Sequence, residues 1–130
     1  MSIITVDVKS RVPIYEQIIV SVKSSVLKGL LSPDEGLPSV RSLAGELAIN
    51  PNTIQKAYSE LERQGIVYSV PGRGSFVASD TSNIEESHKA ELRGKLHDLI
   101  AEAMVCGFTE SEIAEITASA WKESKNDSNK

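Results

Sequence analysis

Hydrophobic and polar residues alternate with different periods along the chain, and these periods predict its elements. From Ile14 to Val26 an apolar residue returns at every fourth position with apolar neighbours beside it, which predicts a helix with one wide buried stripe. Pro13 suits the first position of this helix, because a helix start leaves that backbone N–H unpaired anyway. Before it, apolar and polar residues alternate over Ile4–Val8, which predicts a short strand or an extended arm.

The stretch Leu37–Leu61 predicts two short helices joined by a tight corner. Ser39 is a good N-cap for a helix over Val40–Leu47, because its hydroxyl can accept a hydrogen bond from a free backbone N–H. Ala48 and Ile49 are expected to make the corner.

The second helix of this pair begins with Asn50 as its cap and Pro51 as its first residue. Its apolar residues have the spacing i, i+3, i+4, i+7 of one buried helix face, at Ile54, Ala57, Tyr58 and Leu61. The opposite face is polar. The two helices together are therefore predicted to form a helix-turn-helix.

Two β-prone runs follow directly, Ile66–Val70 and Ser75–Val77, with Pro-Gly-Arg-Gly between them at positions 71–74. Such runs around a glycine-rich tip predict a β-hairpin. A hairpin in this place is the wing of a winged helix.

Residues 79–130 are predicted to form a polar hinge at 79–83, a long amphipathic helix that ends at Gly107, and a last helix. Thr109 and Glu112 have the spacing of a capping box at the start of that last helix. The polar tail, residues 122–130, is expected to fray. The apolar positions of the two helices are Leu92, Leu96, Leu99, Ile100, Met104, Ile113, Ile116 and Trp121. The rest of the chain offers these positions little to bury against, so we expect a second copy to cover them in a homodimer.

The predicted fold class is therefore mainly α with a small β-wing. Residues 1–78 form a winged helix-turn-helix domain and residues 79–130 form a C-terminal two-helix dimerisation segment.

The charge of the chain is unevenly distributed. The net charge is −4, but residues 1–78 carry eight Lys or Arg and seven Asp or Glu, whereas residues 79–130 carry six and eleven. The acidic residues lie mostly outside the predicted winged helix-turn-helix. The negative net charge of the whole chain therefore does not exclude binding of that domain to DNA. No apolar run approaches the ~20 residues of a membrane span, no signal segment is present, and Cys106 is the single cysteine. A cytoplasmic protein that contacts no membrane is expected.

Polar side chains at the start of the second helix and beside it are suited to DNA. Gln and Asn can pair with an adenine edge through two hydrogen bonds, and an arginine at a glycine-rich wing tip suits the minor groove. The predicted DNA-binding residues are Ser39, Arg41, Asn52, Thr53, Gln55, Lys56, Gly72 and Arg73. Taken singly, each helix residue could equally be part of a solvated face, Arg41 a surface ion-pair partner, and Arg73 an exposed turn residue.

The sequence contains no recognisable catalytic site. His88 and His97 lie nine residues apart, on opposite faces of one predicted helix, and no other metal-ligand cluster appears. No nucleophile motif or phosphate-binding loop is present. We therefore predict no enzyme activity, no metal and no cofactor.

Three segments together resemble the winged helix-turn-helix of GntR-type bacterial transcription regulators: LPSVRSLA at 37–44, NPNTIQKAYSELERQGI at 50–66, and PGRGSFV at 71–77. PIYEQI at 13–18 and the short C-terminal region resemble the small YtrA-type subgroup. The resemblance covers residues 3–78. It implies operator binding as a dimer, usually as a repressor and often of a neighbouring transporter operon. A two-fold pair would place its two recognition helices on the half-sites of an inverted repeat. The resemblance also implies DNA roles for Arg41, Asn52, Thr53, Gln55, Gly72 and Arg73.

The sequence departs from the family in three places. The connector reads Pro-Asp-Glu-Gly-Leu at 33–37 where the family usually reads Pro-Gly-Asp-x-Leu, so a rearranged turn is expected. Ser42 stands where the family often has Glu, so the reciprocal half of a capping box with Ser39 is missing. The C-terminal region is too short for a conventional ligand-binding domain, which leaves open whether an unknown small-molecule effector acts on this protein.

A second hypothesis is a protein-interaction module, in which the winged helix is a scaffold and the acidic C-terminal helices bind a partner. The low basic charge of the first domain favours this alternative slightly.

Overall fold

The computed structural model describes residues 3–128 and divides the chain into two units, Met1–Glu86 and Ser87–Lys130. The first unit holds the helices α1 (Ile14–Leu27), α2 (Val40–Leu47) and α3 (Pro51–Arg63) and the strands β1 (Val67–Val70) and β2 (Gly74–Val77). Helix α4 (Ile84–Val105) starts in the first unit and continues into the second, which also contains α5 (Glu110–Ser128). This order confirms a mainly α fold with a small β-wing and a C-terminal helical segment.

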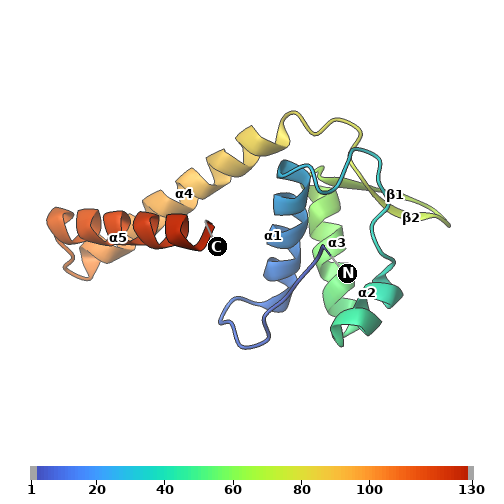
Figure 1. The fold of residues 1–130 in the computed structure, drawn as a ribbon, viewed down its shortest axis with the longest axis horizontal. Coiled ribbons are helices and arrows are strands. Elements are labelled where there is room, and N and C mark those ends of the chain that lie inside the picture. Colours follow the sequence, from blue (N-terminus) through green and yellow to red (C-terminus); the bar gives the residue numbers. More distant parts are fainter. Residues whose placement is uncertain (1–2, 129–130) are drawn as a thin grey trace. The chain divides into compact units, whose positions relative to one another are not determined.

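Helix α3 is the centre of the first unit. It contacts α1, α2 and β1, and Figure 1 shows it running alongside α1. Its predicted buried face is confirmed, since Ile54, Ala57 and Leu61 have no exposed surface and Tyr58 is 3% exposed. Burying a large aliphatic side chain in this way stabilises the fold by roughly 1.5–3 kcal/mol. The same packing that holds α3 in the core determines which of its faces remains free.

The caps predicted for the helix-turn-helix are confirmed. Ser39 Oγ accepts a hydrogen bond from the Ser42 N–H at 3.0 Å, and Asn50 Oδ1 accepts one from the Asn52 N–H at 2.8 Å. The corner between the helices places Ala48 in the left-handed region, with φ 56°. An alanine at this φ is strained, because its Cβ approaches the following carbonyl oxygen.

Replacing Ala48 with glycine is therefore expected to stabilise the protein by about 0.5–1 kcal/mol, because glycine adopts this backbone freely and that gain exceeds its extra entropy in the unfolded chain. Urea unfolding monitored by circular dichroism measures the change. Ala48→Val is the control and should destabilise, since a β-branched residue fits the left-handed region worst. A glycine variant less stable than the parent would contradict the prediction.

The wing is the predicted β-hairpin, an antiparallel pair in which Val67 lies opposite Val77 and Val70 lies opposite Gly74. The connector before α2 adds a third chain segment along β2, which the sequence pattern did not indicate. The Leu37 N–H donates to the Ser75 carbonyl at 2.8 Å, and the Val77 N–H donates to the Glu35 carbonyl at 2.8 Å. The base of the wing is thus bonded to the segment that leads into the helix-turn-helix.

The N-terminal segment forms an arm without strand pairing, so the first of the two predicted alternatives, a strand, is wrong. Side chains of α1 take the place of a neighbouring strand. Gln17 Oε1 accepts from the Asp7 N–H at 2.7 Å, and Ser21 Oγ accepts from the Thr5 N–H at 3.2 Å. Ile4 of this arm packs in the core and is 2% exposed.

The fraying expected for the C-terminal tail is also wrong over residues 122–128, because α5 continues to Ser128. Residues 129 and 130 lie outside the described residues. The helix persists because no glycine or proline interrupts it after the capping box at its start. That capping box is confirmed: the Thr109 N–H donates to Glu112 Oε1 at 2.9 Å, and the Glu112 N–H donates to Thr109 Oγ1 at 3.1 Å.

Candidate nucleic-acid interface

The N-terminal half of α3 presents a polar surface. Asn52, Gln55 and Lys56 are exposed and Thr53 is half-buried, because the apolar positions between them face the core. No acidic residue lies in the first turn of this helix. Side-chain hydrogen-bond donors and acceptors are thus available on one face.

Two of these side chains have partners that sequence reasoning did not find. Gln55 Nε2 donates to Ser59 Oγ at 3.1 Å, one helical turn further along. Lys56 Nζ lies 3.9 Å from the centre of the Tyr15 ring at the start of α1, in a cation–π contact. Tyr15 therefore orients the ammonium group of Lys56 on the exposed surface.

In the C-terminal half of α3, the carboxylate of Glu60 is bound by neighbouring side chains. Glu60 accepts hydrogen bonds from Arg63 and from Gln64, with Arg63 Nε at 2.8 Å and Gln64 Nε2 at 2.9 Å. The Arg63 hydrogen bonds, followed by that of Gln64, lower the pKa of Glu60 from 4.5 to about 2, and the charge of Lys23 contributes. Since the pKa is lowered on folding, these bonds stabilise the protein fully above about pH 4.5, and this stabilisation is lost as the pH falls towards 2. Glu62 is left as the exposed acid of this half.

The start of α2 carries the two predicted residues outside α3 and the wing. Arg41 is exposed in the first turn, and Ser39 is exposed just before it. The Ser39 oxygen is used as the cap acceptor, while its hydroxyl hydrogen is able to donate. Both are thus exposed beside the free N–H groups of a helix start.

The wing tip has the open backbone that the sequence predicted. Gly72 and Gly74 have φ values of 78° and 112°, which side chains other than glycine rarely adopt. The Arg73 N–H donates to the Val70 carbonyl at 2.9 Å and closes the turn, while its side chain is exposed. Behind the tip, the rings of Tyr68 and Phe76 stack with centroids 5.6 Å apart. The tip therefore presents one arginine between two glycines.

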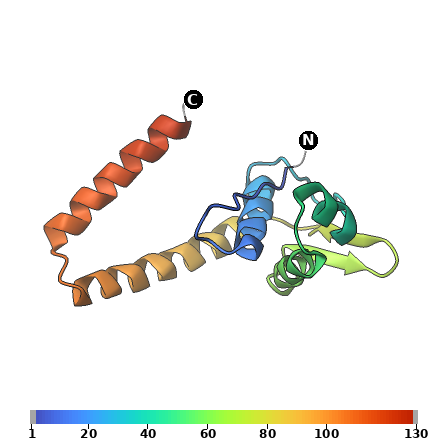
Figure 2. The same cartoon turned by 90° about the horizontal axis from the view of Figure 1, so that it is seen from below.

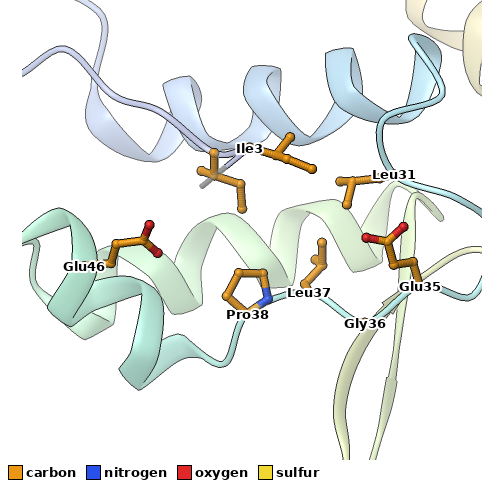
Figure 3. A pocket seen from close by; sticks show the side chains of 8 residues that line it. Ile3, Leu31, Glu35, Gly36, Leu37, Pro38 and Glu46 are labelled. Atoms are coloured by element: carbon orange, nitrogen blue, oxygen red, sulfur yellow. The ribbon is translucent and has the colours of Figure 1, made fainter. Parts of the chain in front are cut away.

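A hollow of about 440 Å³ lies elsewhere in the first unit (Figure 3). Aliphatic residues line it together with Glu35 and Glu46, whose side chains lie on opposite sides of it. The volume is within the range of small-molecule sites, about 300–1,000 Å³. The two carboxylates repel anions, so this hollow is not suited to DNA phosphates.

The second unit carries the residues predicted for dimerisation. Seven of them are exposed by 41–68%, and Ile113 is half-buried; the exposed ones are Leu92, Leu96, Leu99, Ile100, Met104, Ile116 and Trp121. Within residues 87–126, no side chain of the single chain is buried. Figure 2 shows α4 and α5 diverging from the turn that joins them. The two helices alone therefore leave their apolar side chains in water.

Val105 and Phe108, at the turn between α4 and α5, are further exposed apolar residues that the sequence pattern did not indicate.

Among the described residues, no helix is long and apolar enough to cross a membrane, and no group of three or more His, Cys, Asp and Glu side chains is placed to hold a metal ion.

The helix pair with its capped corner, the free polar face of α3 and the hairpin directly after it define a DNA-binding protein of the winged helix-turn-helix class. Residues 14–77 match the family model of the bacterial regulatory proteins of the gntR family. The chain belongs to this GntR family and is a DNA-binding transcription regulator.

Known relatives agree with this assignment over most of the chain. The HTH-type transcriptional repressor YtrA of Bacillus subtilis is 40% identical over 129 residues, which are 95% of this chain and 99% of YtrA. This match confirms the resemblance to the small YtrA-type subgroup. A crystal structure from Listeria monocytogenes EGD-e, named a transcriptional antiterminator, has a TM-score of 0.69 and 38% identity, covering 89% of this chain and 87% of that one.

The DNA-binding domain of AraR in complex with operator ORE1 is a further structural neighbour. It has a TM-score of 0.50 and 32% identity, and the match covers 57% of this chain and 90% of that chain.

Proposed function

We propose that this chain is a homodimeric repressor that binds an inverted-repeat operator, with one α3 helix and one wing on each half-site. The observation that carries the proposal is the free polar face at the N-terminal half of α3, which is held outward by the fully buried positions Ile54 and Ala57. In a helix-turn-helix this end of the second helix enters the major groove. Arg41 and Arg73 then contact the backbone or the neighbouring groove.

The homodimer is supported by the second unit, whose exposed apolar residues on α4 and α5 need a cover. A two-fold pair covers the same surface on both copies and gives two recognition helices related by the symmetry of an inverted repeat. Repression is supported by the similarity to YtrA of B. subtilis, a repressor by name. The family resemblance extends the proposal to control of a neighbouring transporter operon.

Selection from a library of random DNA duplexes, followed by footprinting of the selected sequence, tests this function. We expect an inverted repeat protected on both halves, bound by a dimer in sedimentation experiments. Selection of no palindromic sequence by the intact protein would refute the proposal.

Lys56→Ala tests the part of α3 that is expected to contact phosphate. Because the Tyr15 ring holds the Lys56 ammonium group as a surface charge, its loss should weaken binding to all duplexes alike and reduce the slope of log affinity against log salt by about 1. Fluorescence anisotropy across a salt series measures both effects. Tyr15→Phe retains the ring and should behave as the parent. A loss confined to duplexes with one particular base pair would contradict the phosphate role.

The alternative, a protein-interaction module, is favoured by the same exposed apolar residues of the second unit. Sedimentation of the intact chain without DNA distinguishes the two functions. A dimer supports the repressor, whereas a monomer means that a different partner covers α4 and α5.

A further inference from the structure

Asp34 occupies an unusual backbone position in the connector before α2. The Glu35 N–H donates to the Ser32 carbonyl at 3.1 Å, which closes a four-residue turn with Pro33 second and Asp34 third. The φ of Asp34 is 66°, in the left-handed region that glycine usually occupies at the third position of such a turn. The connector therefore contains a carboxylate where the backbone favours a residue without a side chain.

The Asp34 carboxylate joins three segments of the first unit. Its Oδ1 accepts hydrogen bonds from the Tyr68 hydroxyl of β1 at 2.8 Å and from Ser79 Oγ, just after β2, at 2.6 Å. Its backbone N–H donates to the Val77 carbonyl of β2 at 2.9 Å. The Ser79 hydrogen bond, followed by that of Tyr68, lowers the pKa of Asp34, so the side chain is an ionised acceptor at neutral pH.

These bonds lie at the base of the wing rather than in the core. Asp34, Tyr68 and Ser79 are all exposed, so they add little apolar burial. The wing itself has two strands of four residues each, and an isolated two-stranded hairpin is marginally stable in water. Its direction therefore depends on how its base is attached. Backbone bonds of Glu35 and Leu37 join the connector to β2 only, whereas the Asp34 carboxylate also binds Tyr68 in β1 and Ser79 just after β2.

We propose that Asp34 is a positioning residue for DNA binding. By binding Tyr68 and Ser79, it fixes the wing to the connector that leads into α2 and so orients Arg73 towards the DNA. This inference rests on the proposed function, because it requires that the wing contacts DNA through Arg73. Asp34 itself touches no DNA in this scheme.

The central variant is Asp34→Gly, compared with Asp34→Asn. Glycine adopts the left-handed backbone freely, so it removes the acceptor without straining the turn, whereas asparagine tolerates this backbone and keeps Oδ1 as an acceptor. With the duplex that the intact parent protein selects from the random library, we expect Asp34→Gly to bind about five- to tenfold more weakly while its circular dichroism spectrum stays that of the folded parent, because the two lost hydrogen bonds are exposed and hold the wing rather than the core. Asp34→Asn should bind within about twofold of the parent. Tyr68→Phe and Ser79→Ala, which leave the turn intact, should each reproduce part of the loss.

A double-mutant cycle with Arg73→Ala tests whether Asp34 acts through the wing. In the Arg73→Ala background the additional loss from Asp34→Gly should disappear. If Arg73→Ala weakens binding but Asp34→Gly, Tyr68→Phe and Ser79→Ala all bind like the parent, the positioning role is wrong and the wing contact stands. If the two losses add in full, Asp34 acts by another route and the inference is overturned. If Arg73→Ala itself has no effect, the wing contact of the proposed function fails.

Discussion

In the proposed homodimer, replacing both Leu96 and Leu99 with glutamate is expected to separate the two copies and to weaken operator binding by on the order of 10²–10⁴-fold. Both side chains lie on the apolar face of α4 and are about 60% exposed in the single chain. The substitutions therefore leave the core of the first unit unchanged, but in a dimer they bury two carboxylates on each copy without a partner.

The expected loss in DNA affinity follows from linkage. Once one half-site is bound, the second recognition helix of a dimer binds in an intramolecular step at a high effective concentration, and a monomer lacks this advantage. Sedimentation equilibrium measures the association, and anisotropy with the selected duplex measures the affinity. Binding to a single half-site should be unchanged, which separates lost dimerisation from lost folding.

Ala101→Glu is a matched control for the added charge. Ala101 is exposed and lies about 140° around α4 from Leu96 and about 160° from Leu99, by the 100° rotation per residue of a helix. It should remain a dimer with the operator affinity of the parent. A stable dimer of the Leu96→Glu, Leu99→Glu protein would show that this face of α4 does not form the interface.

Replacing Gln55 with alanine is expected to relax the preference for one base pair in each half-site, by ~1–3 kcal/mol if Gln55 pairs with adenine through two hydrogen bonds. Gln55 is exposed near the start of α3, and its Nε2 already donates to Ser59 Oγ at 3.1 Å. This bond restricts the amide before DNA arrives, so less freedom is lost on binding. Competition between duplexes that differ at single base pairs measures the preference.

Two further residues of α3 serve as controls for Gln55. Ser59→Ala removes the hydrogen-bond acceptor of the Gln55 amide but leaves the amide itself in place. The preference for the base pair should therefore weaken less than in Gln55→Ala. Glu62→Ala removes an exposed acid from the C-terminal half, which should strengthen binding to all duplexes alike. An equal loss over every base pair in Gln55→Ala would remove the base-reading role assigned to Gln55.

Most of the fold could be predicted from the sequence because its elements are encoded locally. The steps of four in α1, the caps Ser39 and Asn50, and the glycine-rich wing tip each specify structure within a few residues of chain. The same local signals predicted a free polar face on α3, since apolar spacing determines which side of a helix is buried. Near Ile4 the sequence predicted a strand or an extended arm and could not choose between them, because alternation indicates an extended segment but does not supply the neighbouring strand that pairing requires.

Only the tertiary structure decided how these elements are joined. The contacts of Lys56 with Tyr15 and of Asp34 with Tyr68 and Ser79 link residues 34 to 45 positions apart, and no local pattern indicates such pairs. The partner of Gln55 is one helical turn away and follows from rotamer choice rather than sequence spacing. The sequence by itself therefore determined the class of protein and the polar face of α3 that is proposed to contact DNA, because helix periods and caps are local. The orientation of the wing and of individual side chains on that face was decided by packing, because it depends on which distant groups the fold brings within hydrogen-bonding distance.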